Sequence, residues 1–146
     1  MKKELTNKIN GYLANVAVSY VKLHNLHWNV TGCQFKAVHE YLESLYDSFA
    51  EVLDAVAEIL KMNGETPLAS MKDYLAVATI EELESKDFDI KGTLGIVLKD
   101  VETLKAQAED IRAEAGEADQ YDVANMMEDD LANYSKTIWF LRSMMK

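Results

Sequence analysis

The chain of 146 residues has the length of one ordinary domain, expected to span residues 1–146, with enough chain to bury a core. Its 15 Lys and Arg against 25 Asp and Glu give a formal charge of −10, which disfavours a surface that coats nucleic acid. Hydrophobic residues make up 49% of the chain and are mixed with 27% charged residues, which is typical of a folded protein and excludes a disordered one.

The single cysteine, Cys33, cannot form an intrachain disulfide, so the sequence does not indicate a disulfide-stapled secreted domain, and we expect a cytoplasmic protein. The N-terminal residues MKKELTNKING have no apolar segment after the two lysines, and no uninterrupted apolar stretch of ~18 residues occurs. We therefore expect neither a signal peptide nor a membrane span.

One proline and six glycines leave few positions that break a helix, so the sequence predicts an all-α fold without strands. The first predicted helix runs from about residue 4 to residue 30. Large or apolar residues recur along it at helical spacing, namely Ile9, Leu13, Val16, Tyr20, Leu23, His27 and Val30. Val18, Val21 and Leu26 add apolar surface elsewhere on this helix, which predicts a second covered side and an interface beyond the bundle.

The second predicted helix begins near residue 35, after a break at residues 31–33, and continues to about residue 63 without glycine or proline. Its apolar stripe consists of Phe35, Val38, Leu42, Leu45, Phe49, Val52, Val56 and Ile59. Gly64 and Pro67 end it. The long connection that follows, residues 64–89, contains ASMKDYLA at positions 69–76, which predicts a short helix.

The third predicted helix runs from about residue 90 to 115 and is ended by Gly116, while the fourth runs from about 122 to 144. Gly92 and Gly95 weaken the first turns of the third helix. Four amphipathic helices with two short connections and one long one predict a ferritin-like four-helix bundle. A short extra helix lies in the long crossover between helices two and three.

Candidate chemistry begins with three histidines that are close together in the sequence: His24, His27 and His39. At ~100° per residue, the carboxylates Glu43, Asp54 and Glu58 lie about 40°, 60° and 100° from His39 around the second helix. His39 and the three carboxylates therefore share one face of the second helix. That face points away from the apolar stripe of its own helix.

Two interpretations of this face are open. A polar helix face is usually solvated, a pair such as Asp54 and Glu58 is usually plain surface, and His27 on an apolar stripe is usually a hydrogen-bonded core residue. Ala50 and Ala57 on the same face favour the other interpretation, because such small residues let a second helix approach closely.

The spacing excludes one ion bound by the whole set within a single chain, because His39 and Asp54 are ~22 Å apart along the helix. Two copies of the helix packed antiparallel about a two-fold axis would, however, bring His39 and Glu43 of one chain to Asp54 and Glu58 of the other. His27 is placed to join His39.

Imidazole and carboxylate ligands without thiolates suit iron, manganese or zinc at a partly open site, and oxygen-rich ligation favours iron. No histidine follows a glutamate by three residues, which excludes the Glu-x-x-His arrangement of di-iron sites inside a bundle.

Residues 24–60, HNLHWNVTGCQFKAVHEYLESLYDSFAEVLDAVAEIL, resemble the Dps family, the ferritin-like mini-ferritins named for DNA protection during starvation. The resemblance rests on His27-Trp28, Gly32, Phe35 and His39, followed by Asp54 and Glu58 at the family's spacing, and the helix lengths fit over nearly the whole chain. It implies a metal site between two subunits. His27, His39 and Glu43 would come from one chain, and Asp54 and Glu58 from its two-fold mate. The family often has Asp at position 43.

The resemblance further implies a ferroxidase, with His27, His39, Asp54 and Glu58 as its catalytic residues. The protein would form a homo-oligomer, a hollow dodecamer built from two-fold dimers. It would oxidise Fe(II), preferably with hydrogen peroxide, store the ferric mineral inside, and so protect against oxidative damage.

DNA binding is not expected. Family members that bind DNA often use a lysine-rich tail, whereas here only Lys2, Lys3 and Lys8 precede or enter the first helix of a chain with charge −10. The alternative functions are a DNA-compacting structural protein and a non-catalytic helical assembly scaffold whose histidines are structural.

Overall fold

The first two long helices form an antiparallel hairpin. In the computed structural model, which describes all of residues 1–146, α1 spans Lys3–Asn29 and α2 spans Phe35–Met62, so both predicted helices are confirmed. Gly32 in the turn between them has a φ of 137°, and a Cβ there would lie 2.8 Å from Ile90 Cγ1. Only glycine fits this turn, because other residues rarely adopt that backbone conformation and have no room.

The second hairpin consists of α4, Ile90–Glu117, and α5, Tyr121–Met144. The Asp89 side chain accepts a hydrogen bond from Gly92 N (2.6 Å) and so caps the start of α4 despite its glycines. The prediction that Gly116 ends the helix is wrong, because α4 continues through it to Glu117. The reversal is made instead by Asp119, whose φ is 57°, a left-handed conformation that Asp adopts more readily than most residues.

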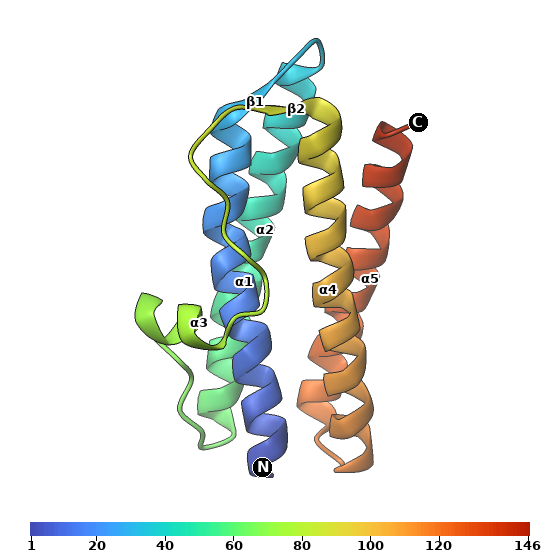
Figure 1. The fold of residues 1–146 in the computed structure, drawn as a ribbon. Coiled ribbons are helices and arrows are strands. Elements are labelled where there is room, and N and C mark those ends of the chain that lie inside the picture. Colours follow the sequence, from blue (N-terminus) through green and yellow to red (C-terminus); the bar gives the residue numbers. More distant parts are fainter.

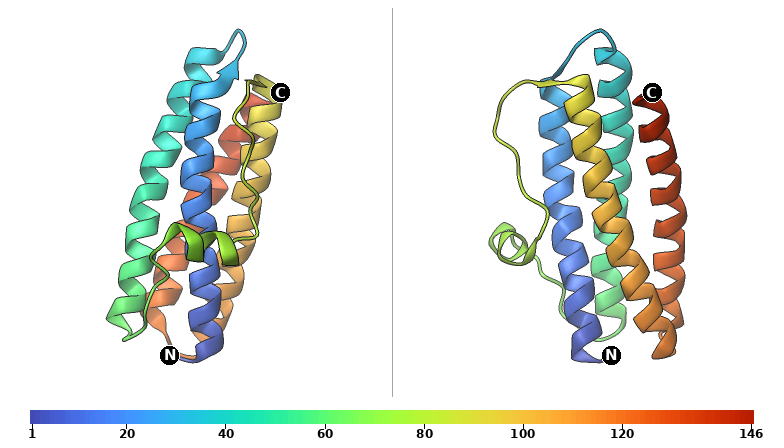
Figure 2. Two further views of the ribbon diagram at one scale, coloured as in Figure 1. Left: turned by 60° about the vertical axis from the view of Figure 1, so that its left-hand side comes forward. Right: turned by 45° about the vertical axis from the view of Figure 1, so that its right-hand side comes forward.

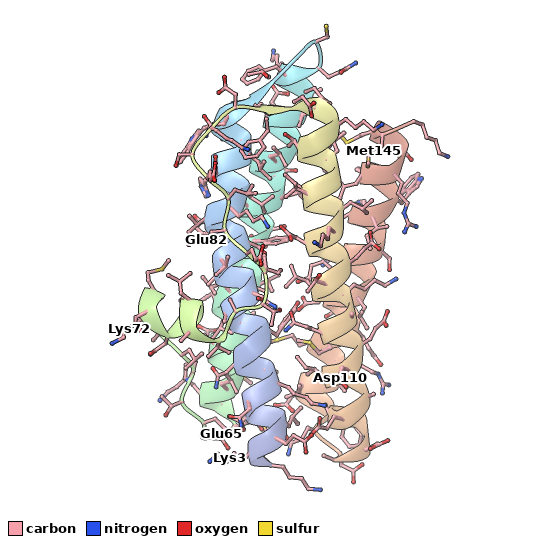
Figure 3. All side chains as sticks on the ribbon, viewed as in Figure 1. Lys3, Glu65, Lys72, Glu82, Asp110 and Met145 are labelled. Carbon is pink, nitrogen blue, oxygen red and sulfur yellow. The ribbon has the colours of Figure 1, made fainter.

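The crossover between the hairpins carries the predicted short helix, α3, Met71–Val77, which begins with the Ser70 side chain as its cap. Figure 2 shows α3 lying across the outer side of α1. Asn15 of α1 anchors the end of the crossover, because its side-chain oxygen accepts from Thr79 N (2.8 Å) and Ile80 N (3.0 Å). Lys72 of α3 projects away from the bundle (Figure 3).

Two short strands, which the sequence analysis did not anticipate, join the crossover to the first hairpin. β1, Val30–Thr31, pairs in parallel with β2, Phe88–Asp89. Each strand has only two residues, too few to show a sequence pattern, and they pair because the turn after α1 and the end of the crossover meet at the same end of the bundle (Figure 1). This pairing holds the α1–α2 turn against the start of α4.

The core lies between the four long helices, which run side by side along the bundle (Figure 1). The all-α, ferritin-like four-helix bundle with a helix in its crossover is therefore confirmed. Of the extra apolar residues on α1, Val18 and Leu26 are buried, whereas Val21 is 47% exposed. None of the helices combines the length and the apolar character needed to cross a membrane.

Candidate functional site

The site begins with two histidines that the α1–α2 turn brings together, His27 in the last turn of α1 and His39 in the second turn of α2. Their imidazole rings are stacked, with centroids 3.7 Å apart and planes 11° from parallel. His27 Nδ1 donates to the His39 carbonyl oxygen and His39 Nδ1 donates to the His27 carbonyl oxygen, both at 2.7 Å.

These reciprocal hydrogen bonds determine which ring nitrogens are free. A carbonyl oxygen only accepts, so Nδ1 of each ring carries the hydrogen, and Nε2 of each neutral ring keeps its lone pair. A ring held through Nδ1 in this way is the arrangement that orients a histidine for binding a metal through Nε2. The two parallel imidazoles therefore provide two nitrogen atoms that can act as metal ligands at one end of the bundle.

Glu43, one turn further along α2, is the carboxylate next to this pair. Its Oε1 lies 3.9 Å from His27 Nε2, and its side chain is 57% exposed. Tyr46 OH donates to the same oxygen at 3.4 Å, and the Tyr46 ring lies edge-on to His27 with centroids 5.2 Å apart. Burial and the Glu43 carboxylate raise the pKa of Tyr46, which keeps its phenol protonated as a donor.

Tyr46 is the residue of this site to which the sequence analysis gave no role. Its spacing from Glu43, three residues along a helix, was a usable signal, because side chains at that separation are neighbours. The structure also gives a physical reason to favour His27 over His24. His24 Nδ1 faces the Tyr20 carbonyl oxygen (2.7 Å) and its ring stacks on Tyr46 (3.8 Å), so it exchanges no hydrogen bond with His39.

Asp54 and Glu58 lie further along α2 and are exposed, with no ion pair or hydrogen bond to another side chain of the chain. No three His, Cys, Asp or Glu side chains converge where one ion could be held. A single chain therefore has two separate groups of the predicted ligands: His27, His39 and Glu43 near the start of α2, and Asp54 and Glu58, which follow His39 by 15 and 19 residues.

A second polar cluster, which the sequence analysis missed, lies in the core between α1 and α5. Tyr12 OH donates to Asp130 Oδ2 (2.8 Å) and shares a hydrogen bond of 2.5 Å with Tyr134 OH. All three side chains are buried, and burial raises the pKa of Asp130 to about 6. Because 118 residues separate Tyr12 from Asp130, no local pattern could have predicted this contact.

Comparison with known proteins places this arrangement in a family. Residues 6–146 match the family model described as a ferritin-like domain. Antigen TpF1 of Treponema pallidum is 34% identical over 97% of this chain and 80% of its own length, and its crystal structure superimposes with a TM-score of 0.96 over 98% of this chain and 92% of that one.

Two further similar proteins support the same family assignment. DNA protection during starvation protein 2 of Bacillus anthracis is 30% identical over 98% of this chain and 97% of its own. The crystal structure of a Dps protein from Vibrio cholerae, described as a member of a broad superfamily of ferritin-like diiron-carboxylate proteins, is 28% identical over 99% of this chain and 90% of that chain, with a TM-score of 0.94. The chain therefore belongs to the ferritin-like domain family and, within it, to the Dps proteins.

Proposed function

We propose that this protein is a ferroxidase and iron-storage protein that binds Fe(II) at a site shared between two copies of the chain. The observation that carries the proposal is the His27–His39 pair, whose reciprocal hydrogen bonds use Nδ1 of each ring and leave both Nε2 atoms without a hydrogen bond. A ligand set that is oriented but incomplete in one chain calls for further ligands from outside it.

The missing ligands are supplied, in this proposal, by Asp54 and Glu58 of a two-fold mate. Both are exposed on the α2 face that also carries Glu43, and neither has a partner in its own chain that would compete. Ala50 and Ala57, between and beside them on α2, leave room for a second helix to approach. Antiparallel packing of two α2 helices would form two identical sites per dimer. We propose that such dimers assemble further into a hollow dodecamer.

The donor set suits the chemistry. Carboxylate oxygens with imidazole nitrogens bind Fe(II) and stabilise the harder Fe(III) product, because negative oxygen ligands favour the higher charge. Two Fe(II) ions give up one electron each, and hydrogen peroxide takes both electrons and two protons as its O–O bond breaks to give two water molecules. This reaction removes both reagents that otherwise generate hydroxyl radicals, and the ferric product is stored inside the shell.

The relatives support iron as the substrate. One structural neighbour is described as a ferritin-like diiron-carboxylate protein, and other relatives are named for DNA protection during starvation. The exposed carboxylates of α2 would also attract cations to the site, since charges of one sign on one surface raise the local concentration of counter-ions.

The test is anaerobic loading of the purified native protein with Fe(II), followed by a pulse of hydrogen peroxide while ferric absorbance is recorded. The Asp54→Ala, Glu58→Ala double variant is compared with native protein. We expect fast, soluble ferric formation in native protein and only slow oxidation with precipitation in the variant, because the variant lacks the two carboxylates of the shared site.

A matched control removes two exposed carboxylates elsewhere, by Glu81→Ala and Glu82→Ala in the crossover. This variant has the same net charge as the test variant and should behave as native. Full activity in the Asp54→Ala, Glu58→Ala protein would refute the shared site. Equal slow oxidation in all three proteins would favour the scaffold function, in which the histidines are structural.

DNA compaction is the weaker alternative. A chain of charge −10 meets a phosphate backbone with repulsion that grows with each added subunit, so we propose no DNA contact. The measurement is gel retardation of a DNA duplex at low salt, where electrostatic binding is strongest, and a retarded band that disappears with added salt would favour the alternative.

A further inference from the structure

A groove runs between α2 and α5 and is separate from the histidine site. Its volume is about 450 Å³, within the range of small-molecule binding sites. Its apolar and aromatic walls include Leu45, Phe49 and Val52 of α2 and Phe140 of α5. Asp130 also lines it, so a groove with both apolar and polar walls contains a buried carboxylate.

Asp130 has no cationic partner in the chain. Its side chain forms none of the ion pairs of the structure, and its residue exposure is only 8%. Oδ2 accepts from Tyr12 OH, whereas Oδ1 accepts no hydrogen bond from the protein. The only fully buried side-chain oxygens without a partner are those of Ser19 and Thr93, so Asp130 Oδ1 is open to the groove.

A buried carboxylate without a counter-charge is costly, and the cost is relieved by a proton or by a cation from outside. Because burial raises the pKa of Asp130 only to about 6, the carboxylate is ionised at pH 7.5 and then has no ion-pair partner in the chain. A cation in the groove would supply the missing partner.

The lining selects the kind of cation. No three His, Cys, Asp or Glu side chains converge here, and the hydroxyls of Ser44 and Ser48 donate to carbonyl oxygens of their own helix. Glu51, the other carboxylate of the lining, is exposed, so Asp130 is the only buried one. A single buried carboxylate is a poor ligand set for a divalent metal ion, which needs several oxygen donors. It suits a singly charged organic cation whose hydrocarbon part is buried against the walls.

The groove already has an ammonium group against one of its aromatic walls. Lys136 Nζ lies 5.6 Å from the centroid of the Phe140 ring, and both residues line the groove. This is the geometry of a cation–π contact. Lys136 makes no ion pair with Asp130, which is six residues away on α5 and so not on the neighbouring turn. Asp130 is thus left for a second cation.

We propose that the groove between α2 and α5 binds a small primary alkylammonium ion, with the Asp130 carboxylate as its counter-ion. The ammonium donates to Asp130 Oδ1 and the alkyl chain packs on Phe49, Val52 and Phe140. This site does not depend on the proposed iron chemistry, because no residue of the histidine site lines it.

The probe is n-hexylamine, titrated calorimetrically into the native, assembled protein at pH 7.5, with n-hexanol as the neutral ligand of matched shape. We expect saturable binding with one site per chain, at least ~10-fold tighter for the amine than for the alcohol, because only the amine satisfies the buried charge. Equal affinity for the two ligands, or no saturable binding of the amine, would overturn the proposal.

Asp130→Asn keeps the size and the acceptor for Tyr12 but removes the charge, and we expect it to weaken hexylamine binding at least ~10-fold. Asp129→Asn is the matched control, since it removes one charge from the next residue, which is exposed and outside the groove, and should change the affinity less than twofold. Equal losses in the two variants would overturn the assignment of Asp130.

A second variant tests the groove without touching the charge. Ala55→Leu adds volume to a half-buried wall position on α2 and should abolish hexylamine binding while Asp130 stays in place. Circular dichroism of each variant verifies that the bundle is folded. Unchanged binding to a folded Ala55→Leu protein would place the amine outside the groove and refute the proposal.

Discussion

The two polar clusters of this bundle differ in what they leave unsatisfied. Tyr12 and Tyr134 in the core are buried and hydrogen-bonded to each other, and Asp130 joins them from the edge of a groove. His27 and His39, at the end of the α1–α2 hairpin, bond to each other's backbone and leave two imidazole nitrogens without a partner.

This difference predicts that the core cluster contributes to stability and the histidine cluster to function. The phenols of the core cluster have their partners within one chain, so changing them should alter the free energy of unfolding. The histidine cluster is oriented by the chain but completed by nothing in it, so changing it should alter binding and oxidation of a substrate. A core variant that slows iron oxidation without loss of stability would contradict this assignment.

The largest expected effect is on iron oxidation. His39→Ala removes one of the two Nε2 ligand atoms and the ring that stacks on His27, while the backbone carbonyl that orients His27 stays, so we expect the peroxide-dependent rate of Fe(II) oxidation to fall by about 10-fold to 100-fold. Ferric absorbance after a peroxide pulse measures the rate. His24→Ala is the matched control, because His24 has the same kind of Nδ1 bond to a backbone carbonyl but no contact with His39, and should oxidise iron at the native rate. Comparable losses in both variants would contradict the assigned pair.

The next effect is on stability. Tyr12→Phe keeps the ring but removes the hydroxyl that donates to Asp130, and leaves Tyr134 without its partner, which should cost about 2 kcal/mol of unfolding free energy. In a chain of this length, the melting temperature should fall by roughly 4–8 °C. Tyr74→Phe, at a half-buried tyrosine without a side-chain hydrogen bond, is the control and should melt as native. A Tyr12→Phe protein that melts as native but oxidises iron slowly would reverse the two roles.

The local sequence pattern predicted the long helices correctly, but it did not predict the structures that end and connect them. The apolar stripes gave α1 and α2 to within a residue, because burial of one helix face dominates their stability. Gly116 failed as a stop signal because tertiary packing of α4 on α5 outweighs the small local preference of one glycine. The β1–β2 pair depends on where the crossover returns, which no stripe encodes.

The candidate site, too, was predictable from the sequence only in part. Spacing across a short turn was sufficient to pair His27 with His39, and helical angles placed Glu43, Asp54 and Glu58 on one face. The exchange of hydrogen bonds between the histidines depends on side-chain rotamers and could not be read from spacing.

A smaller effect follows from pH. Because the pKa of Asp130 is raised from 3.8 to about 6 in the folded protein, the folded state holds this proton more tightly, and the stability that results is present below pH ~4 and lost as pH rises through 6. Asp130→Asn has no proton to lose. The unfolding free energy of the variant relative to native should therefore rise by about 1–2 kcal/mol between pH 5 and pH 8, measured by denaturant titration at each pH. A difference that stays constant with pH would contradict the assignment, and iron oxidation should be unchanged throughout.

The smallest effect concerns the loosest member of the histidine cluster. Glu43 is 57% exposed, lies 3.9 Å from His27 Nε2 and is held only by a 3.4 Å hydrogen bond from Tyr46. A 3.9 Å separation is too long for a hydrogen bond, so Glu43 is only weakly tied to the histidine pair, and Glu43→Gln should lower the rate of peroxide-dependent Fe(II) oxidation by no more than about fivefold, less than His39→Ala. Stopped-flow measurement of both variants under the same conditions ranks them. A Glu43→Gln loss as large as that of His39→Ala would mean that the carboxylate binds iron directly, because a water-mediated contact tolerates replacement of one oxygen by an amide nitrogen better than a direct bond does.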